Sequence, residues 1–100
     1  MYFITCFSRC EEGDNGWFDG GYICTFGYYD NFYTCKKALN ENWGDMHEYL
    51  YKFAVVELIE QGIQQHAKEI AWFQWDNERQ GFFETDKPNC TFGLCNHAFG

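Results

Sequence analysis

The chain has 100 residues and a formal net charge of −8, and 22 of its residues are Phe, Tyr or Trp. A chain of this length forms one domain, whose small core needs large rings, a metal, disulfides or self-association to supplement it. Only seven Lys and Arg residues are scattered among fifteen acids, which argues against nucleic-acid binding and against an anionic membrane surface. The charge instead favours a basic partner, or simply keeps an aromatic-rich surface in solution.

The first third of the chain predicts two strands around an acidic loop. Residues 2–8 are rich in aromatic and β-branched side chains on both faces, which predicts a strand that is central or covered. Residues 22–29 predict a second strand. The loop between them, residues 9–21, is acidic and glycine-rich and contains Trp17 and Phe18. Because loops carry function more often than cores do, these rings are candidates for binding.

A helix is predicted over residues 31–42. Asp30 provides an N-cap, and Gly44 provides a stop. One face of this helix is apolar at helical spacing and consists of Phe32, Cys35, Ala38 and Leu39.

The remainder of the chain predicts three further strands. Residues 49–59 are apolar on both faces and predict a mid-sheet strand. After a connection, the rings of residues 72–75 favour a strand over 69–76 rather than a helix over 63–73. Residues 76–81 predict a hairpin turn with Gly81 in a left-handed conformation, and residues 82–85 return.

The whole chain therefore predicts one α+β domain, residues 1–100, with the order β-β-α-β-β-β. The sheet is expected to be curved and mostly antiparallel, with one helix packed across it. The tail from Lys87 onward is too aromatic for a free end, and we expect it to dock on the domain.

Cysteine usage leaves two readings open. Cys6 and Cys10, Cys90 and Cys95 form two short-spaced pairs with His97 nearby, a set that suits a zinc knot joining the chain ends. Neither pair has the usual CxxC spacing, and buried cysteine is a common small hydrophobe, so we expect no structural metal and no cofactor. Cys24 and Cys35 are expected in the core. No secretory signal is recognisable at the N-terminus, so we expect reduced thiols and a cytoplasmic protein.

Catalysis is not predicted, because no cysteine or histidine lies in a recognisable nucleophile context. The best candidate is a ligand-binding site at the acidic loop. There Trp17 or Trp43 stacks a base, Arg9 meets a phosphate, and Asp14 or Asp19 accepts hydrogen bonds from ribose hydroxyls. The competing interpretation is that the rings pack the two covered faces of the sheet.

Several stretches together resemble a family of small, mostly uncharacterised, acidic and aromatic-rich proteins from gut Gram-positive bacteria and their phages. These stretches are residues 2–6, 26–30, 43–48, 51–57, 72–76 and 98–100. The resemblance carries no site residues, but it implies a phage counter-defence protein. One such class sequesters nucleotide-derived immune signals, such as the cyclic ADP-ribose species made by TIR-domain enzymes. Another class blocks CRISPR effectors by direct contact.

The functional expectation is a non-catalytic, self-associating protein in the host bacterial cytoplasm that sequesters a nucleotide-derived ligand of the cyclic ADP-ribose type. Many aromatic residues in a small domain favour association, because one core cannot hide them all. The alternative is an acidic inhibitor that binds a basic nucleic-acid-binding effector, such as a CRISPR nuclease.

Overall fold

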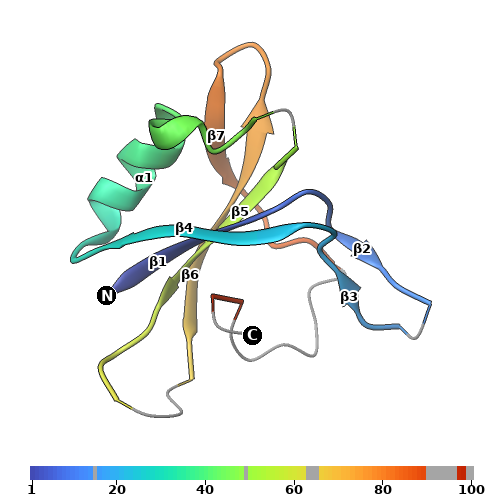
Figure 1. The fold of residues 1–100 in the computed structure, drawn as a ribbon, viewed down its shortest axis with the longest axis horizontal. Helices are drawn as coiled ribbons and strands as arrows, with labels where there is room; N and C mark the ends of the chain where they lie inside the picture. The colour runs from blue at the N-terminus through green and yellow to red at the C-terminus, as the bar shows by residue number, and fades with distance from the viewer. Residues whose placement is uncertain (15, 49, 63–65, 90–96, 99–100) are drawn as a thin grey trace.

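Five strands form one antiparallel sheet in the computed structural model, which describes residues 1–14, 16–48, 50–62, 66–89 and 97–98 (Figure 1). The strands are β1 (Tyr2–Phe7), β4 (Ile23–Tyr29), β5 (Phe53–Leu58), β6 (Lys68–Asp76) and β7 (Gly81–Thr85), in the spatial order β4-β1-β5-β6-β7. The helix α1 (Phe32–Asn40) packs across one face. This arrangement confirms the α+β prediction, with β5 in the middle and β1 beside it.

The acidic loop contains a small hairpin that the sequence did not predict. It consists of β2 (Glu11–Glu12) and β3 (Phe18–Asp19), which pair only with each other and lie beside the main sheet (Figure 1). The ring of Phe18 packs edge-on against Phe7 of β1, with ring centroids 5.3 Å apart. The hairpin therefore helps to cover the face of the sheet opposite α1.

The helix begins one residue later than predicted. Asn31, not Asp30, is the N-cap, because its side-chain oxygen accepts the Thr34 backbone N–H at 2.8 Å. The helix ends at Asn40, before the predicted stop. Asn42 takes a left-handed conformation with φ 52°, and Gly44 lies in the following short helical turn η1 (Trp43–Asp45).

Strands β6 and β7 pair as the predicted C-terminal hairpin. The alternative of a helix over 63–73 is wrong in its described part, because β6 occupies 68–76. The left-handed residue of its turn is Gln80 (φ 55°) rather than Gly81. Gly81 serves another purpose, because a Cβ atom there would lie only 2.9 Å from the backbone carbonyl carbon of Asn40 in α1. The glycine is needed for close approach of helix and strand.

The sheet has apolar side chains on both faces. The face under α1 holds the larger core, which includes Ile4, Cys6, Leu39, Val56, Phe73 and Phe82. The opposite face holds a smaller cluster of Phe7, Val55 and Trp72. Two covered faces explain why β1 and β5 lack the polar alternation of a half-exposed strand. No helix in the described part of the chain is long and apolar enough to span a membrane.

Candidate functional site

The acidic loop, residues 9–21, carries four of the five predicted site residues: Arg9, Asp14, Trp17 and Asp19. Arg9 Nη2 lies 2.9 Å from a carboxylate oxygen of Asp19, and the other oxygen accepts the Gly21 N–H at 2.9 Å. The hydrogen bond from the Gly21 N–H, followed by the one from the Arg9 guanidinium, holds the pKa of Asp19 below its usual range. Asp14 and Trp17 are exposed. A ligand at this hairpin would have to compete with the Arg9–Asp19 pair.

Trp43, the fifth predicted residue, lies elsewhere. It belongs to η1, which follows α1 on the side of the molecule away from the β2–β3 hairpin (Figure 1). Its ring packs edge-on against Tyr29 at 6.1 Å, and its Nε1–H donates to Glu41 Oε1 at 3.0 Å. The structure therefore does not assemble Trp43 with the hairpin residues.

A hollow that the sequence did not predict lies where β5 begins and β6 ends. Its volume is about 320 Å³, and it is lined by His47, Lys52, Phe53, Gln74, Trp75 and Asn77. We call it the β5–β6 hollow. Phe53 and Gln74 are direct partners across the two strands, and the Trp75 N–H donates to the Lys52 carbonyl at 2.8 Å. Antiparallel pairing thus brings residues from three separate segments together.

The aromatic wall of the β5–β6 hollow is held in place from several sides. The imidazole of His47 stacks on the Trp75 indole with centroids 3.7 Å apart and planes 3° from parallel. Nδ1 of His47 lies 2.8 Å from the Tyr51 carbonyl oxygen, which only accepts, so this nitrogen carries the hydrogen. The indole Nε1–H donates to Asn77 Oδ1 at 2.8 Å. These contacts give a preordered stack beside two amide side chains.

The charge of this hollow differs from that of the protein as a whole. None of its described lining residues is acidic, and Lys52 makes no ion pair with any described residue. A second hollow of about 330 Å³ shares Gln74, Trp75 and Asn77 with it and adds Arg79, together with the carboxylates of Asp76 and Glu84. There the Arg79 guanidinium lies 3.7 Å above the Phe83 ring, and its Nε donates to Asp76 at 2.8 Å.

These groups suit binding of a flat, anionic ligand. Rings stack on planar bases, carboxamides of Asn and Gln hydrogen-bond to purine edges, and a lysine ammonium attracts a phosphate. The described lining residues of the β5–β6 hollow include no Ser, Thr or Cys that would act as a nucleophile. One signal was available in the sequence: Gln74 and Asn77 interrupt a strongly aromatic strand end. His47 and Lys52 lie too far away in the chain to be linked with them.

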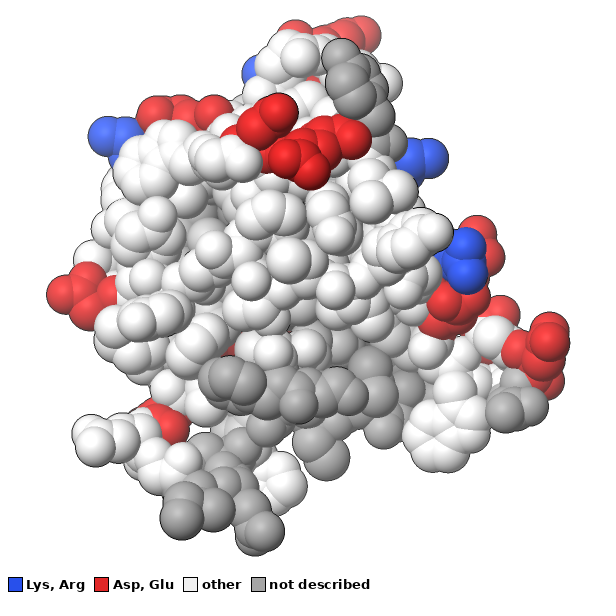
Figure 2. All heavy atoms as spheres, viewed as in Figure 1, with Lys and Arg blue, Asp and Glu red and all other residues white. Residues whose placement is uncertain are grey.

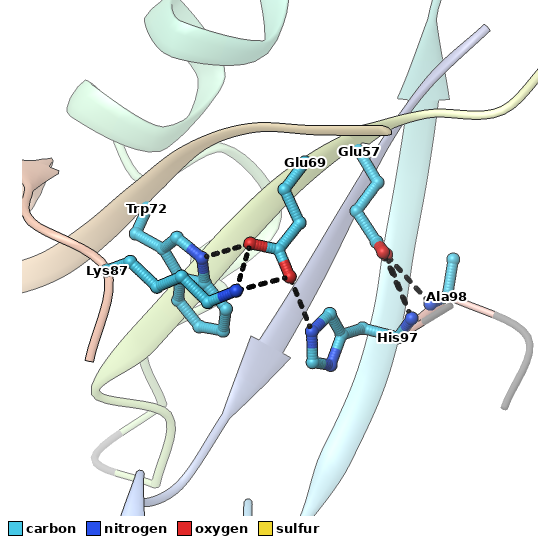
Figure 3. A network of polar contacts seen from close by, with 6 residues as sticks. All are labelled: Glu57, Glu69, Trp72, Lys87, His97 and Ala98. Atoms are coloured by element: carbon cyan, nitrogen blue, oxygen red, sulfur yellow. Dashed lines mark hydrogen bonds and ion pairs between the residues drawn. The ribbon is translucent and has the colours of Figure 1, made fainter. Parts of the chain in front are cut away.

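A polar network on the face opposite α1 offers two carboxylates and a histidine (Figure 3). Glu57 is fully buried, and its carboxylate accepts the backbone N–H groups of His97 and Ala98 at 3.0–3.2 Å. Glu69 accepts the Trp72 indole N–H at 3.1 Å, pairs with Lys87 at 3.1 Å and lies 3.4 Å from His97 Nε2.

Burial raises the pKa of Glu57, although the N–H groups of His97 and Ala98 oppose the rise. The pKa of Glu69 is lowered: burial pushes it up, but the hydrogen bonds from Trp72 and Lys87 outweigh that effect. The His97 ring is buried among Phe7, Phe18 and Trp72, with centroids 5.3–5.7 Å away. The network therefore fastens the tail to the sheet, which confirms the predicted docking for residues 97–98.

The cysteines described by the structure are free thiols. Cys35 is buried in the core as predicted, and burial raises its pKa to about 11, whereas Cys24 is only half-buried on β4. Burial also raises the pKa of Cys6. Among described residues, no group of three or more His, Cys, Asp or Glu is placed to hold a metal. Cys90 and Cys95 lie outside the described residues, so the zinc hypothesis stays untested.

The chain matches no known family, no curated protein and no solved structure. Its function therefore has to be inferred from the chemistry of its own residues.

Proposed function

We propose that the protein is a non-catalytic binder that sequesters a nucleotide-derived ligand in the β5–β6 hollow. The observation that carries the proposal is one hollow that combines a fixed His47–Trp75 stack, two carboxamides and the ammonium of Lys52, which forms no ion pair with a described residue. The ligand class is the cyclic ADP-ribose type, and the biological role is phage counter-defence in the cytoplasm of a host bacterium. Both rest on the resemblance stated from the sequence, and the chemistry of the hollow supports the ligand class alone.

Size and charge support this ligand class. A volume of about 320 Å³ falls at the lower end of typical small-molecule sites, and the adjoining hollow beside Arg79 extends it. A ligand with two phosphates would meet Lys52 in one hollow, and in the other it would compete with Asp76 for the Arg79 guanidinium. Because the net charge of −8 repels anions at long range, a local cationic site is required for such a ligand to bind.

Self-association belongs to the same proposal. The outer strand β4 contains no charged residue, although edge strands are commonly protected by charges. Ile23 and Tyr28 on this strand, and Tyr22 just before it, are at least half exposed. Pairing of two copies along this side would cover these side chains.

Calorimetry with a panel of cyclic ADP-ribose isomers, linear ADP-ribose and AMP tests the binding. We expect one panel member to bind and to be recovered unchanged by chromatography. Lys52→Ala and Gln74→Ala should each weaken binding about tenfold, as expected for loss of one charged or hydrogen-bonding contact of about 1.4 kcal/mol. Lys37→Ala, an exposed change on α1, is the matched control.

Two results would contradict the proposal: no binding by any panel member, or full affinity in both the Lys52 and Gln74 variants. Trp17→Ala and Arg9→Ala test the hairpin site predicted from the sequence. If these two variants lose affinity while the Lys52 and Gln74 variants do not, the ligand binds at the acidic hairpin instead.

The alternative function, an acidic inhibitor of a basic protein, is favoured by a different observation. Figure 2 shows that the middle of the face bearing α1 and β4 carries neither acidic nor basic side chains, while acidic side chains, with fewer basic ones among them, lie around it. An uncharged surface with a mostly acidic rim is complementary to a partner with an apolar centre and a mostly basic rim.

A further inference from the structure

A small apolar pocket opens between β4, the C-terminal part of α1 and η1. Its volume is about 160 Å³, and we call it the anchor pocket. It is lined by Ile4, Phe26, Gly27, Tyr29, Ala38, Trp43, Gly44 and Met46. None of these residues is charged, and they come from four separate elements or turns.

Two glycines create this space. Gly27 lies directly opposite Ile4 across β4 and β1, so its missing side chain leaves a hollow over the buried Ile4. A Cβ atom built at Gly27 would meet no heavy atom within 4 Å, and the same is true at Gly44. The backbone at Gly27 is not left-handed, so a larger residue would fit its conformation there.

Aromatic rings form the rim of the pocket. Phe26 and Trp43 are 36% and 37% exposed, which is high for such large apolar residues. Phe26 is held edge-on by Tyr51 at 5.3 Å, and Trp43 is held by Tyr29 and by its hydrogen bond to Glu41. The rim is therefore ordered in the absence of a partner, which lowers the entropy cost of binding.

The volume decides what kind of group enters. About 160 Å³ is well below the ~300 Å³ at which small-molecule sites begin, so a nucleotide does not fit. It suits a single large apolar side chain. Protein interfaces obtain much of their affinity from such anchors, which fill ready-made pockets ringed by other contacts.

The charges beside the pocket decide which partner supplies that side chain. Three exposed acids neighbour its lining residues, since Asp30 follows Tyr29, Asp45 follows Gly44, and Glu41 bonds to Trp43, whereas one exposed cation, Lys37, precedes Ala38. These acids agree in sign with the net charge of −8. Pairing of two copies along β4 would cover Tyr22, Ile23 and Tyr28, none of which lines this pocket. A second copy seated in the pocket itself would bring like charges together, whereas a basic partner gains attraction and a faster encounter.

We propose that the anchor pocket receives one large apolar side chain from a partner protein, on a segment that carries Lys or Arg close to it. The pocket gives the affinity, and the acidic rim gives the preference for a basic segment. This site is separate from the β5–β6 hollow and does not depend on nucleotide binding.

Selection of a displayed library of random twelve-residue peptides against the protein tests this inference. The selected peptides are expected to share one aromatic or large aliphatic residue with Lys or Arg within a few positions. A synthetic copy is then measured by fluorescence anisotropy against wild type, Gly27→Leu and Tyr33→Leu. Gly27→Leu fills the pocket and should weaken binding at least tenfold, while Tyr33→Leu places leucine at a highly exposed position of α1 and should change little.

Trp43→Ala gives a second test, because it removes one wall of the pocket and is expected to weaken binding even if Gly27→Leu folds poorly. Alanine in place of the peptide's apolar residue should have the same effect. The inference is overturned if no peptide is selected, if the peptides lack the basic–apolar pattern, or if they bind both pocket variants as well as wild type. A Gly27→Leu protein that changes from dimer to monomer would identify a second copy as the occupant instead. Nucleotide affinity should be unchanged in Gly27→Leu, which separates this test from that of the proposed function.

Discussion

Replacing Gly81 by Ala tests the closest approach between the helix and the sheet. Gly81 is buried at the start of β7, and an added Cβ would overlap the backbone carbonyl oxygen of Asn40 in α1. It would also lie 3.1 Å from the Phe83 ring. Because the obstructing atom belongs to the backbone of the helix, the strain cannot be relieved by a side-chain rotation. The end of α1 has to move away from β7.

The expected cost follows from this overlap. Overpacking of this kind costs about 1–3 kcal/mol. With an unfolding entropy of about 2.1 cal/mol/K per residue, 1 kcal/mol corresponds to about 5 °C in Tm for this chain length, so Tm should fall by about 5–15 °C. Gly27→Ala is the matched control. Its Cβ touches nothing and its backbone accepts alanine, so a gain of about 0.4–1 kcal/mol is expected from the lower entropy of the unfolded chain.

Thermal unfolding followed by circular dichroism, with urea titrations at 25 °C, measures both variants. Relative to wild type, Gly81→Ala should lose stability and Gly27→Ala should gain it. If Gly81→Ala is as stable as wild type, or if both variants lose stability equally, the close packing of α1 on β7 is wrong.

Other measurements test the buried groups and the assembly. The raised pKa of Glu57 means that its contribution to stability is present below its unfolded pKa and is lost as pH rises through its folded pKa, whereas the lowered pKa of Glu69 gives a contribution that is lost as pH falls through its folded pKa. Urea titrations from pH 3 to 7 should therefore show opposite pH trends for Glu57→Gln and Glu69→Gln, each relative to wild type. Matching trends would contradict these pKa directions. Hydrogen exchange should show that Glu57→Ala exposes the amides of residues 97–98, and retained protection would mean that other contacts hold the tail. Mass spectrometry after alkylation at pH 8 should find Cys35 unmodified in the folded protein, because its pKa is about 11. Light scattering should give a mass above that of one chain, and a monomer at high concentration would refute self-association. Metal analysis of the purified protein should find no stoichiometric zinc, and unfolding on chelation would establish the cysteine site.

Much of the fold was predictable because its signals are local. The helix was found from an apolar stripe that includes Cys35 and Leu39, and it lies within two residues of the predicted ends. The strands β1 and β5 were placed inside the sheet because both of their faces are apolar, which reflects cover on two sides. Periodicity of this kind depends only on neighbouring residues, so the chain alone reveals it.

The tertiary structure decided which polar and aromatic groups meet. Arg9 and Asp19 were both predicted to bind a ligand, but the hairpin places them against each other. Lys52 and Trp75 are remote in sequence, and they meet because β5 pairs antiparallel with β6. The role of Gly81 likewise depends on a helix forty residues earlier in the chain. Side-chain periodicity determines the faces of each element, but strand pairing and helix packing determine the neighbours across them, and a binding site is made of those neighbours.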